Sequence, residues 1–415
     1  MKLKKFIKGL SKKQKIIWLG VIAFLIIVLL RRSAGSNSNA RKAAFGYQVR
    51  TFDPAKVYKM IMLTDVTNWE VRCRAIAAAG FDTVQLVVPM SNTFVGGLNY
   101  YTDLADYAVS QGLNIVLKPW IRVSPEMLGT FPLNDLMKGP GGEMILDLNY
   151  ILSFGSTRWN FVYNWFGQVK EAFQPLQDAG YIVANFPAIS ETQEWVYPLP
   201  FQGDWSNAET TASNGLNQTR DFSYSVYQAN QLKEKLHAIA AIFNGWNNGL
   251  DVGSFYYDFH KWGGTYHLEL IADHPQIRFI KNNPMNDDTF QFNAALCYDW
   301  KRRTGKYFAA EYTNSPSNTA KETLAERHGA MIQNGCNLLS FAFHSPDGTG
   351  AGESFQKAKD TKALLEANGL WNSPVITPNR QGDFTYTVLN LFQNGHSGII
   401  GSFNSNPARN VRITA

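Results

Sequence analysis

The sequence predicts an α/β fold, a (β/α)8 TIM barrel with long loops at its C-terminal face. Short apolar runs of strand length recur eight times between residues 55 and 370, and helical patterns alternate with them. No Gly-x-Gly-x-x-Gly or P-loop motif follows any of these runs. That absence disfavours the alternative, an open doubly wound sheet, because such sheets bind nucleotides through those motifs.

The expected strands are residues 59–64, 83–89, 113–120, 181–189, 252–259, 276–282, 307–310 and 337–343. The expected helices are residues 68–79, 103–111, 158–178, 223–243, 290–302, 320–333 and 354–368, with a poorly defined helical stretch near 268–273. Asn68 is the expected N-cap of the first helix. Residues 124–158 and 198–220 interrupt the alternation after the third and fourth strands, so these loops lie at the end where barrels build their sites.

The composition along the chain predicts five parts. Residues 1–15 form a basic cytoplasmic segment, residues 16–30 a transmembrane anchor and residues 31–45 a flexible polar tether. Residues 46–370 form the barrel, which we expect to be the catalytic domain. Residues 371–415 form a small β-rich C-terminal segment with a turn near residues 393–395.

The apolar run at residues 16–30 is shorter than the roughly 20 residues of a typical span, but Lys15 and Arg31 can snorkel from its ends. The distribution of basic residues keeps the N-terminus in the cytoplasm and places the barrel outside it, in the periplasm or at the cell surface. A cleaved signal peptide is the alternative. The basic pair at residues 31–32 argues against cleavage, although the small residues 33–35 leave that alternative open.

The basic net charge of +6 comes from the N-terminal segment. Residues 1–42 hold eleven basic residues and no acidic one, which leaves 28 basic against 33 acidic residues in the remainder. The folded part is therefore mildly acidic, so the basic net charge of the whole chain is no evidence for a nucleic-acid partner. The three cysteines, Cys73, Cys297 and Cys336, show no zinc-type spacing and are expected to be small buried residues. No metal or organic cofactor is expected.

Two expected strands end in carboxylates. Glu311 follows the seventh strand, and Glu191 and Glu194 follow the fourth. In an eight-stranded barrel these two strand ends face one another across the mouth. Cleavage of a glycosidic bond needs two carboxyl groups about 5–9 Å apart, one as proton donor and one as nucleophile or base. Solvated loop carboxylates are the structural alternative for Glu191 and Glu194, and for Glu311 a pair with a nearby Lys or Arg.

The two strand ends resemble those of the clan A glycoside hydrolases, the retaining (β/α)8 superfamily of β-galactosidases and cellulases. The resemblance implies that Glu311 is the nucleophile. It implies that Glu194 is the acid/base, since Gln193-Glu194 is similar to the family's Asn-Glu pair. The run at residues 194–198 is also similar to the Glu-Leu-Arg-Tyr-Pro run of β-amylases. Ser190-Glu191 is the alternative match for the Asn-Glu pair, so Glu191 remains the alternative acid/base.

Aromatic and polar residues near the other strand ends are candidates for sugar contacts, because rings stack on sugars and polar groups bind their hydroxyls. These candidates are Trp120, Arg122, Trp195, Tyr257, Asp258, His260, Asn282 and His344. Barrel packing is the alternative role for the Trp and His residues. We therefore expect a membrane-anchored glycoside hydrolase whose partners are a carbohydrate and, through residues 16–30, a lipid bilayer. The alternative is a catalytically inactive carbohydrate-binding or attachment protein built on a glycosidase-like barrel.

Overall fold

The computed structural model describes residues 47–63, 66–139, 142, 144, 150–189, 195, 222–252, 271–282, 301, 304–311, 320–343 and 352–373 of the chain. The chain divides into two compact units, Met1–Val49 and Arg50–Ala415. All the helices and strands described below belong to the second unit.

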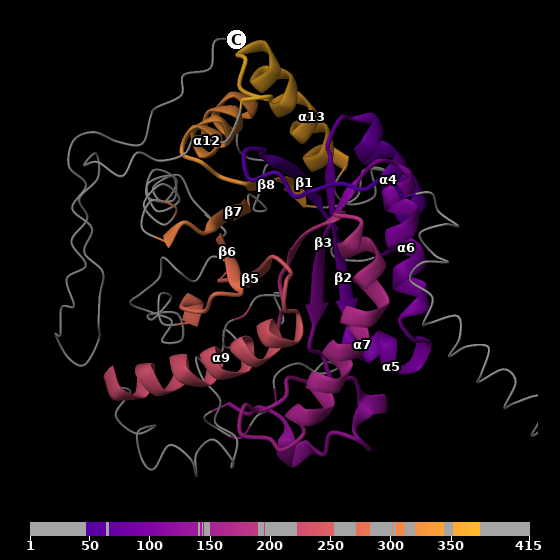
Figure 1. Ribbon diagram of the computed structural model, residues 1–415, viewed down its shortest axis with the longest axis vertical. Coiled ribbons are helices and arrows are strands. Elements are labelled where there is room, and N and C mark those ends of the chain that lie inside the picture. The colour runs from indigo at the N-terminus through magenta and orange to yellow at the C-terminus, as the bar shows by residue number, and fades with distance from the viewer. Residues whose placement is uncertain are drawn as a thin grey trace, which may run out of the picture. The chain divides into compact units, whose positions relative to one another are not determined.

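Eight parallel strands form a closed barrel in which each strand pairs with the next and β8 pairs with β1 (Figure 1). This confirms the expected barrel. The strands are β1 (Tyr58–Met62), β2 (Thr83–Pro89), β3 (Asn114–Trp120), β4 (Ile182–Asn185), β5 (Asn248–Asp251), β6 (Ile277–Asn282), β7 (Tyr307–Glu311) and β8 (Leu338–Phe343).

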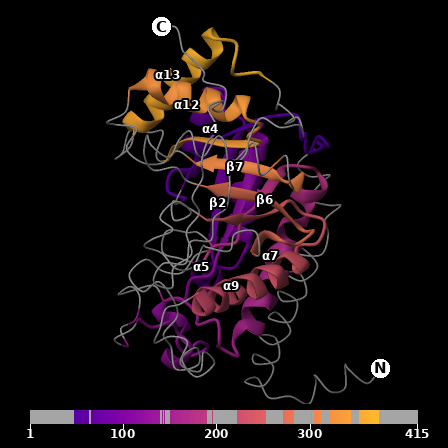
Figure 2. The ribbon, with the colours of Figure 1, turned by 90° about the vertical axis from the view of Figure 1, so that its left-hand side faces the viewer.

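Helices connect the strands on the outside of the barrel. They are α4 (Trp69–Ala78), α5 (Met90–Gly96), α6 (Asn99–Ser110), α7 (Trp159–Asp178), α9 (Phe222–Ile242), α12 (Lys321–Gln333) and α13 (Gly352–Ala367). Two short 3-10 helices, Pro125–Met127 and Leu133–Asp135, lie in the long connection after β3. Helices α12 and α13 lie side by side next to β8, and α7 lies beside α9 (Figures 1 and 2).

The prediction for the fifth strand was wrong. The fifth strand of the barrel is Asn248–Asp251, directly before the predicted range of residues 252–259, of which the structure describes only Val252. Its sequence, Asn-Gly-Leu-Asp, lacks an apolar run because two of its residues are committed to polar contacts. The Asn248 amide donates to two carbonyls near the end of α9, Ala240 O at 3.4 Å and Phe243 O at 3.0 Å, and Asp251 joins a buried ion-pair network.

Asn68 is the N-cap residue of α4, as expected, but its side chain does not cap the helix. Asn68 has a left-handed backbone (φ 52°) and makes no side-chain cap hydrogen bond to α4. An N-cap side chain reaches the first helical N–H groups from an extended backbone, which Asn68 does not have. Asn tolerates the left-handed conformation better than most residues, and this explains its presence at the turn into α4.

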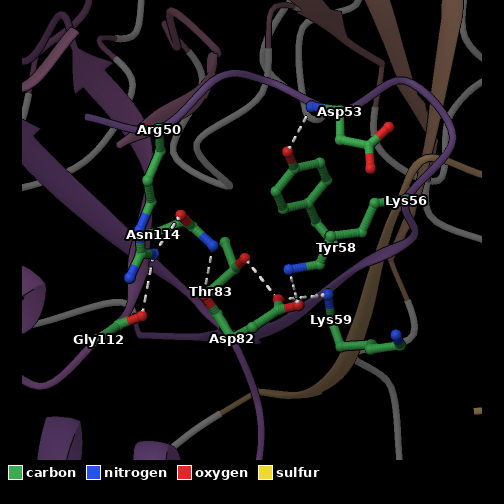
Figure 3. Close-up of polar contacts among 9 residues, drawn as sticks. All are labelled: Arg50, Asp53, Lys56, Tyr58, Lys59, Asp82, Thr83, Gly112 and Asn114. Atoms are coloured by element: carbon green, nitrogen blue, oxygen red, sulfur yellow. Dashed lines mark hydrogen bonds and ion pairs between the residues drawn. The ribbon is translucent and has the colours of Figure 1, made fainter. Parts of the chain in front are cut away.

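The segment that precedes β1 packs against the N-terminal end of the barrel. The Phe52 ring lies 5.4 Å from Tyr58 and 4.9 Å from Tyr307, centroid to centroid. Arg50 donates from Nη1 to Gly112 O (3.1 Å) and Asn114 Oδ1 (3.0 Å), as Figure 3 shows. In TIM barrels this end supports stability, while the opposite end carries the chemistry.

The first and third cysteines are free and buried, as expected. Burial raises the pKa of Cys73 to about 12, which keeps its thiol protonated. Cys297 lies outside the described residues.

No helix among the described residues is both long and apolar enough to cross a bilayer. Residues 1–46 and 374–415 lie outside the described part of the chain, and with them the expected anchor, tether and most of the C-terminal segment.

Candidate active site

A row of four buried charged side chains crosses the C-terminal end of the barrel. Asp251 Oδ2 accepts from Lys118 Nζ at 2.9 Å and from Lys281 Nζ at 2.8 Å. The Lys281 ammonium also forms an ion pair with Glu311 Oε2. The four residues come from β3, β5, β6 and β7. Two ammonium groups and two carboxylates make the row electrically neutral.

The strand pattern explains why these side chains meet. Val116, Phe279 and Ala309 belong to the core cluster inside the barrel. Since side chains alternate along a strand, the residues two positions further on face inward as well: Lys118, Lys281 and Glu311. Asp251 is the register partner of Lys281, so it shares that inner face. The strand ends therefore bring together side chains that are far apart in the sequence.

The row keeps Asp251 and Lys281 charged despite complete burial. Burial by itself would raise the pKa of Asp251, but the ammonium groups of Lys118 and Lys281 outweigh burial and lower it. Burial by itself would lower the pKa of Lys281, but the Asp251 and Glu311 carboxylates outweigh burial and raise it. A buried charge is tolerated when opposite charges and hydrogen bonds compensate it, and each charge of this row has such a partner.

Asp251 also binds the segment that follows β4. Its backbone carbonyl accepts from the backbone N–H of Trp195 at 2.8 Å. Trp195 is fully buried, and its indole Nε1 donates to Leu232 O of α9 at 3.1 Å. These contacts are those of a packing residue, which was the structural alternative for Trp195. One residue of β5 thus binds Lys281 through its side chain and Trp195 through its main chain.

Several buried polar atoms near this end have no hydrogen-bond partner among the described residues. Both amide atoms of Asn282, the last residue of β6, are of this kind, and so is the Ser340 hydroxyl. Ser340 is the register partner of Glu311 on β8 and therefore lies on the same face. A buried hydroxyl without a partner is costly, and a hydrogen-bonding ligand at this face would satisfy Ser340. Asn282 follows Lys281 on β6, so its side chain faces away from Glu311.

Trp120 and Arg122 lie at the end of β3, where the sequence placed them. The Arg122 guanidinium stacks over the Trp120 ring, 5.0 Å from its centroid, and both side chains are partly exposed. The chain continues beside β4, where Ile121 N donates to Ala188 O at 2.8 Å. This pair offers an aromatic face and a cation at the rim.

Six of the predicted site residues lie outside the described residues. They are Glu191, Glu194, Tyr257, Asp258, His260 and His344. Among the residues that the structure describes, no group of three or more His, Cys, Asp or Glu side chains could hold a metal ion.

The sequence analysis missed Asp251 and Lys281. Asp251 fell just before the misplaced fifth strand. Lys281 had a signal: in the strand Ile-Arg-Phe-Ile-Lys-Asn it lies two residues after Phe279, on the same face. A lysine at an inward position near a strand end needs a buried anion, and the sequence did not say which.

Comparison with protein-family models finds no match for this sequence, and comparison with curated proteins finds none at a significant level. Comparison with solved structures finds glycosidase barrels, and their likeness to this closed barrel shows that the chain shares their (β/α)8 fold.

Three of these structures are β-galactosidases. The enzyme of the psychrophilic Marinomonas ef1 has a TM-score of 0.53 at 12% identity over 76% of this chain. The enzyme of Halorubrum lacusprofundi has a TM-score of 0.55 at 10% identity over 75% of this chain. Gan42B, a GH42 β-galactosidase from G. stearothermophilus, has a TM-score of 0.54 at 12% identity over 79% of this chain. The matches span 61%, 58% and 59% of those enzymes, respectively.

Proposed function

We propose that this chain is a glycoside hydrolase that cleaves O-glycosidic bonds of a poly- or oligosaccharide by a retaining, two-carboxylate mechanism. The observation that carries the proposal is the position of Glu311, a buried carboxylate on the inner face of the barrel at the C-terminal end of β7. Barrel enzymes place their chemistry at this end. The likeness to β-galactosidase barrels supports the same class of reaction.

In this mechanism Glu311 is the nucleophile and Glu194 the acid/base. A Glu311 oxygen attacks the anomeric carbon while Glu194 gives its proton to the departing oxygen, and a glycosyl ester forms. Glu194 then takes a proton from water, and the water oxygen attacks the same carbon. The bond to Glu311 breaks, and its electron pair returns to the carboxylate. Two inversions at one carbon retain the configuration.

The Ser340 hydroxyl, which shares the inner face of the barrel with Glu311, supports a sugar-binding role for this end of the barrel. A sugar hydroxyl both donates and accepts, so it satisfies the Ser340 hydroxyl. Trp120 and Arg122 supply a stacking face and a cation at the rim. Side chains alone carry out this mechanism, without a metal or an organic cofactor.

The test is hydrolysis of a panel of aryl glycosides. Glu311→Gln should lower kcat by several orders of magnitude, because the covalent step needs the carboxylate. Glu194→Gln should slow substrates with poor leaving groups far more than activated ones, because only the former need a proton. Leaving-group dependence in Glu191→Gln instead would move the acid/base role to Glu191. Parent-like hydrolysis by all three variants would refute the proposal.

We also propose that residues 16–30 anchor the chain in a membrane, with the barrel outside the cytoplasm. Support comes from the apolar run and the basic residues that precede it. Protease added to intact spheroplasts should remove the barrel. Full protection of the barrel would contradict this topology.

A non-catalytic carbohydrate-binding or attachment protein is the second candidate function. It is favoured by the ion pair with Lys281, which gives Glu311 a structural role, and by Gln193 in place of the family's Asn. Such a protein would bind oligosaccharides equally well after Glu311→Gln and would hydrolyse none of them. Calorimetric titration with the same glycosides distinguishes the two functions.

A further inference from the structure

We propose that Lys281, which is itself held by Asp251, is a positioning residue that orients Glu311 and promotes release of the glycosyl group from it. This inference rests on the proposed function. It assigns roles to two residues that the sequence analysis did not select.

The first step of the argument is geometric. Lys281 extends from the inner face of β6, and its ammonium reaches Asp251 on one neighbouring strand and Glu311 on the other. The Asp251 contact fixes Nζ at 2.8 Å from Oδ2. An ammonium bound on both sides cannot turn away from Glu311 without losing a buried ion pair. Lys281 therefore fixes one oxygen of the Glu311 carboxylate.

The second step concerns charge during the reaction. In the free protein the row has two ammonium groups and two carboxylates. When Glu311 becomes an ester it loses its negative charge, and the row then carries one net positive charge. Release of the sugar returns the electron pair to Glu311 and restores neutrality. Excess positive charge next to an ester oxygen stabilises the carboxylate that leaves, which favours the second step.

The third step identifies a control residue within the row. Lys118 is a buried inward lysine like Lys281, and it binds the same oxygen of Asp251 at 2.9 Å. In the described part of the chain its ion pair is with Asp251, and Lys281 separates Asp251 from Glu311 in the row. Replacing Lys118 also removes one positive charge from the row, but it leaves the contact between Lys281 and Glu311 in place. A difference between the two lysines therefore reports the direct contact.

The first experiment compares the parent with Lys281→Met, Lys281→Arg and Lys118→Met on an activated aryl glycoside. We expect Lys281→Met to lose about 100- to 1,000-fold in kcat, in the range for removal of one charge-stabilising donor. Intact-mass spectrometry should show accumulation of its glycosyl-enzyme. Lys281→Arg should restore kcat and abolish the accumulation, because it restores the cation. If Lys281→Met and Lys118→Met show the same loss of kcat and the same accumulation, the proposal is overturned.

The second experiment needs no hydrolysis. Unfolding free energies of the parent, Lys281→Met, Glu311→Gln and the double variant form a double-mutant cycle. We expect Lys281→Met to cost less once Glu311 is already Gln, and additive effects would overturn the proposal. If Lys281→Met does not fold, Lys281→Gln, which keeps an amide donor, replaces it in both experiments. If the cycle is non-additive but the parent protein hydrolyses no glycoside, the proposed function is refuted, while the contact between Lys281 and Glu311 is confirmed.

Discussion

Lys281 Nζ lies 2.8 Å from Asp251 Oδ2, and both side chains are almost completely buried. The same ammonium holds Glu311, so the carboxylate at the end of β7 faces a cation. From the sequence alone, Glu311 is expected to face the carboxylates that follow the fourth strand, and removing the charge of a carboxylate that faces another is neutral or favourable. The ion pair reverses that expectation.

Glu311→Gln should therefore destabilise the protein at pH 7. Breaking a buried ion pair costs about 3–5 kcal/mol, and we expect about 1–3 kcal/mol because Lys281 keeps Asp251 as a partner. Urea unfolding measures this change. The control is Glu366→Gln, which removes an exposed partner of Lys362 on α13 and should change stability by less than about 0.5 kcal/mol. Equal effects of the two variants would contradict the buried pair.

Gly249→Ala should destabilise the barrel by about 1–3 kcal/mol through overpacking. A Cβ atom at Gly249 would lie 2.1 Å from Cε1 of Phe186, a fully buried ring inside the barrel. Gly167→Ala is the matched control. A Cβ atom there meets nothing within 4 Å, and Gly167 lies inside α7, so alanine should stabilise by about 0.5–1 kcal/mol. Opposite shifts of the thermal midpoint are expected.

Stability should fall as the pH decreases from about 6.5 to about 4 because of His328. This imidazole is buried between α12 and β8, with Nδ1 2.7 Å from Leu324 O and Nε2 3.2 Å from Ser340 O. Burial, against the opposing effect of the Leu324 and Ser340 carbonyls and with a smaller contribution from Arg327, lowers the pKa of His328 to about 4. Its folded-state pKa is depressed, so the unfolded chain binds the proton first, and the stabilisation present above pH 6.5 is lost on acidification.

The expected loss from His328 is up to about 3 kcal/mol, since each pKa unit corresponds to about 1.4 kcal/mol. Unfolding free energies at pH 7 and pH 4.5, for the parent and for His328→Gln, isolate this contribution from that of other groups. The variant should show a shallower dependence on pH. An unchanged dependence would mean that His328 is charged in the folded state.

A chain that begins at residue 47 should be as stable as the full chain, and one that begins at residue 57 should not. The second truncation removes Phe52 from the end of the barrel, together with the contacts of Arg50 to Gly112 and Asn114. Loss of a partly buried phenylalanine and these hydrogen bonds should cost about 2–4 kcal/mol. Circular dichroism during heating measures both truncations. Phe52→Ala in the longer chain should reproduce part of the loss.

The sequence predicted most of the fold because local signals mark its elements. Seven of the eight strands lie where apolar runs of strand length occur. Helices α6 and α7 are amphipathic, and a glycine follows the end of each. The fifth strand was misplaced because its four residues have little apolar character. Asn68 lies at the predicted N-cap position but makes no side-chain cap hydrogen bond, because Asn is common both at helix caps and in left-handed turns.

What the sequence by itself determined is the barrel and the place of Glu311 at the end of β7, because strand length and apolar character are local properties. What only the tertiary structure decided is the set of residues that meet Glu311. Asp251 and Lys281 are 30 positions apart, and they meet because β5 and β6 pair in one register on the inner face. Register and barrel closure depend on long-range packing of the whole sheet, and no local pattern encodes which buried cation faces which buried carboxylate.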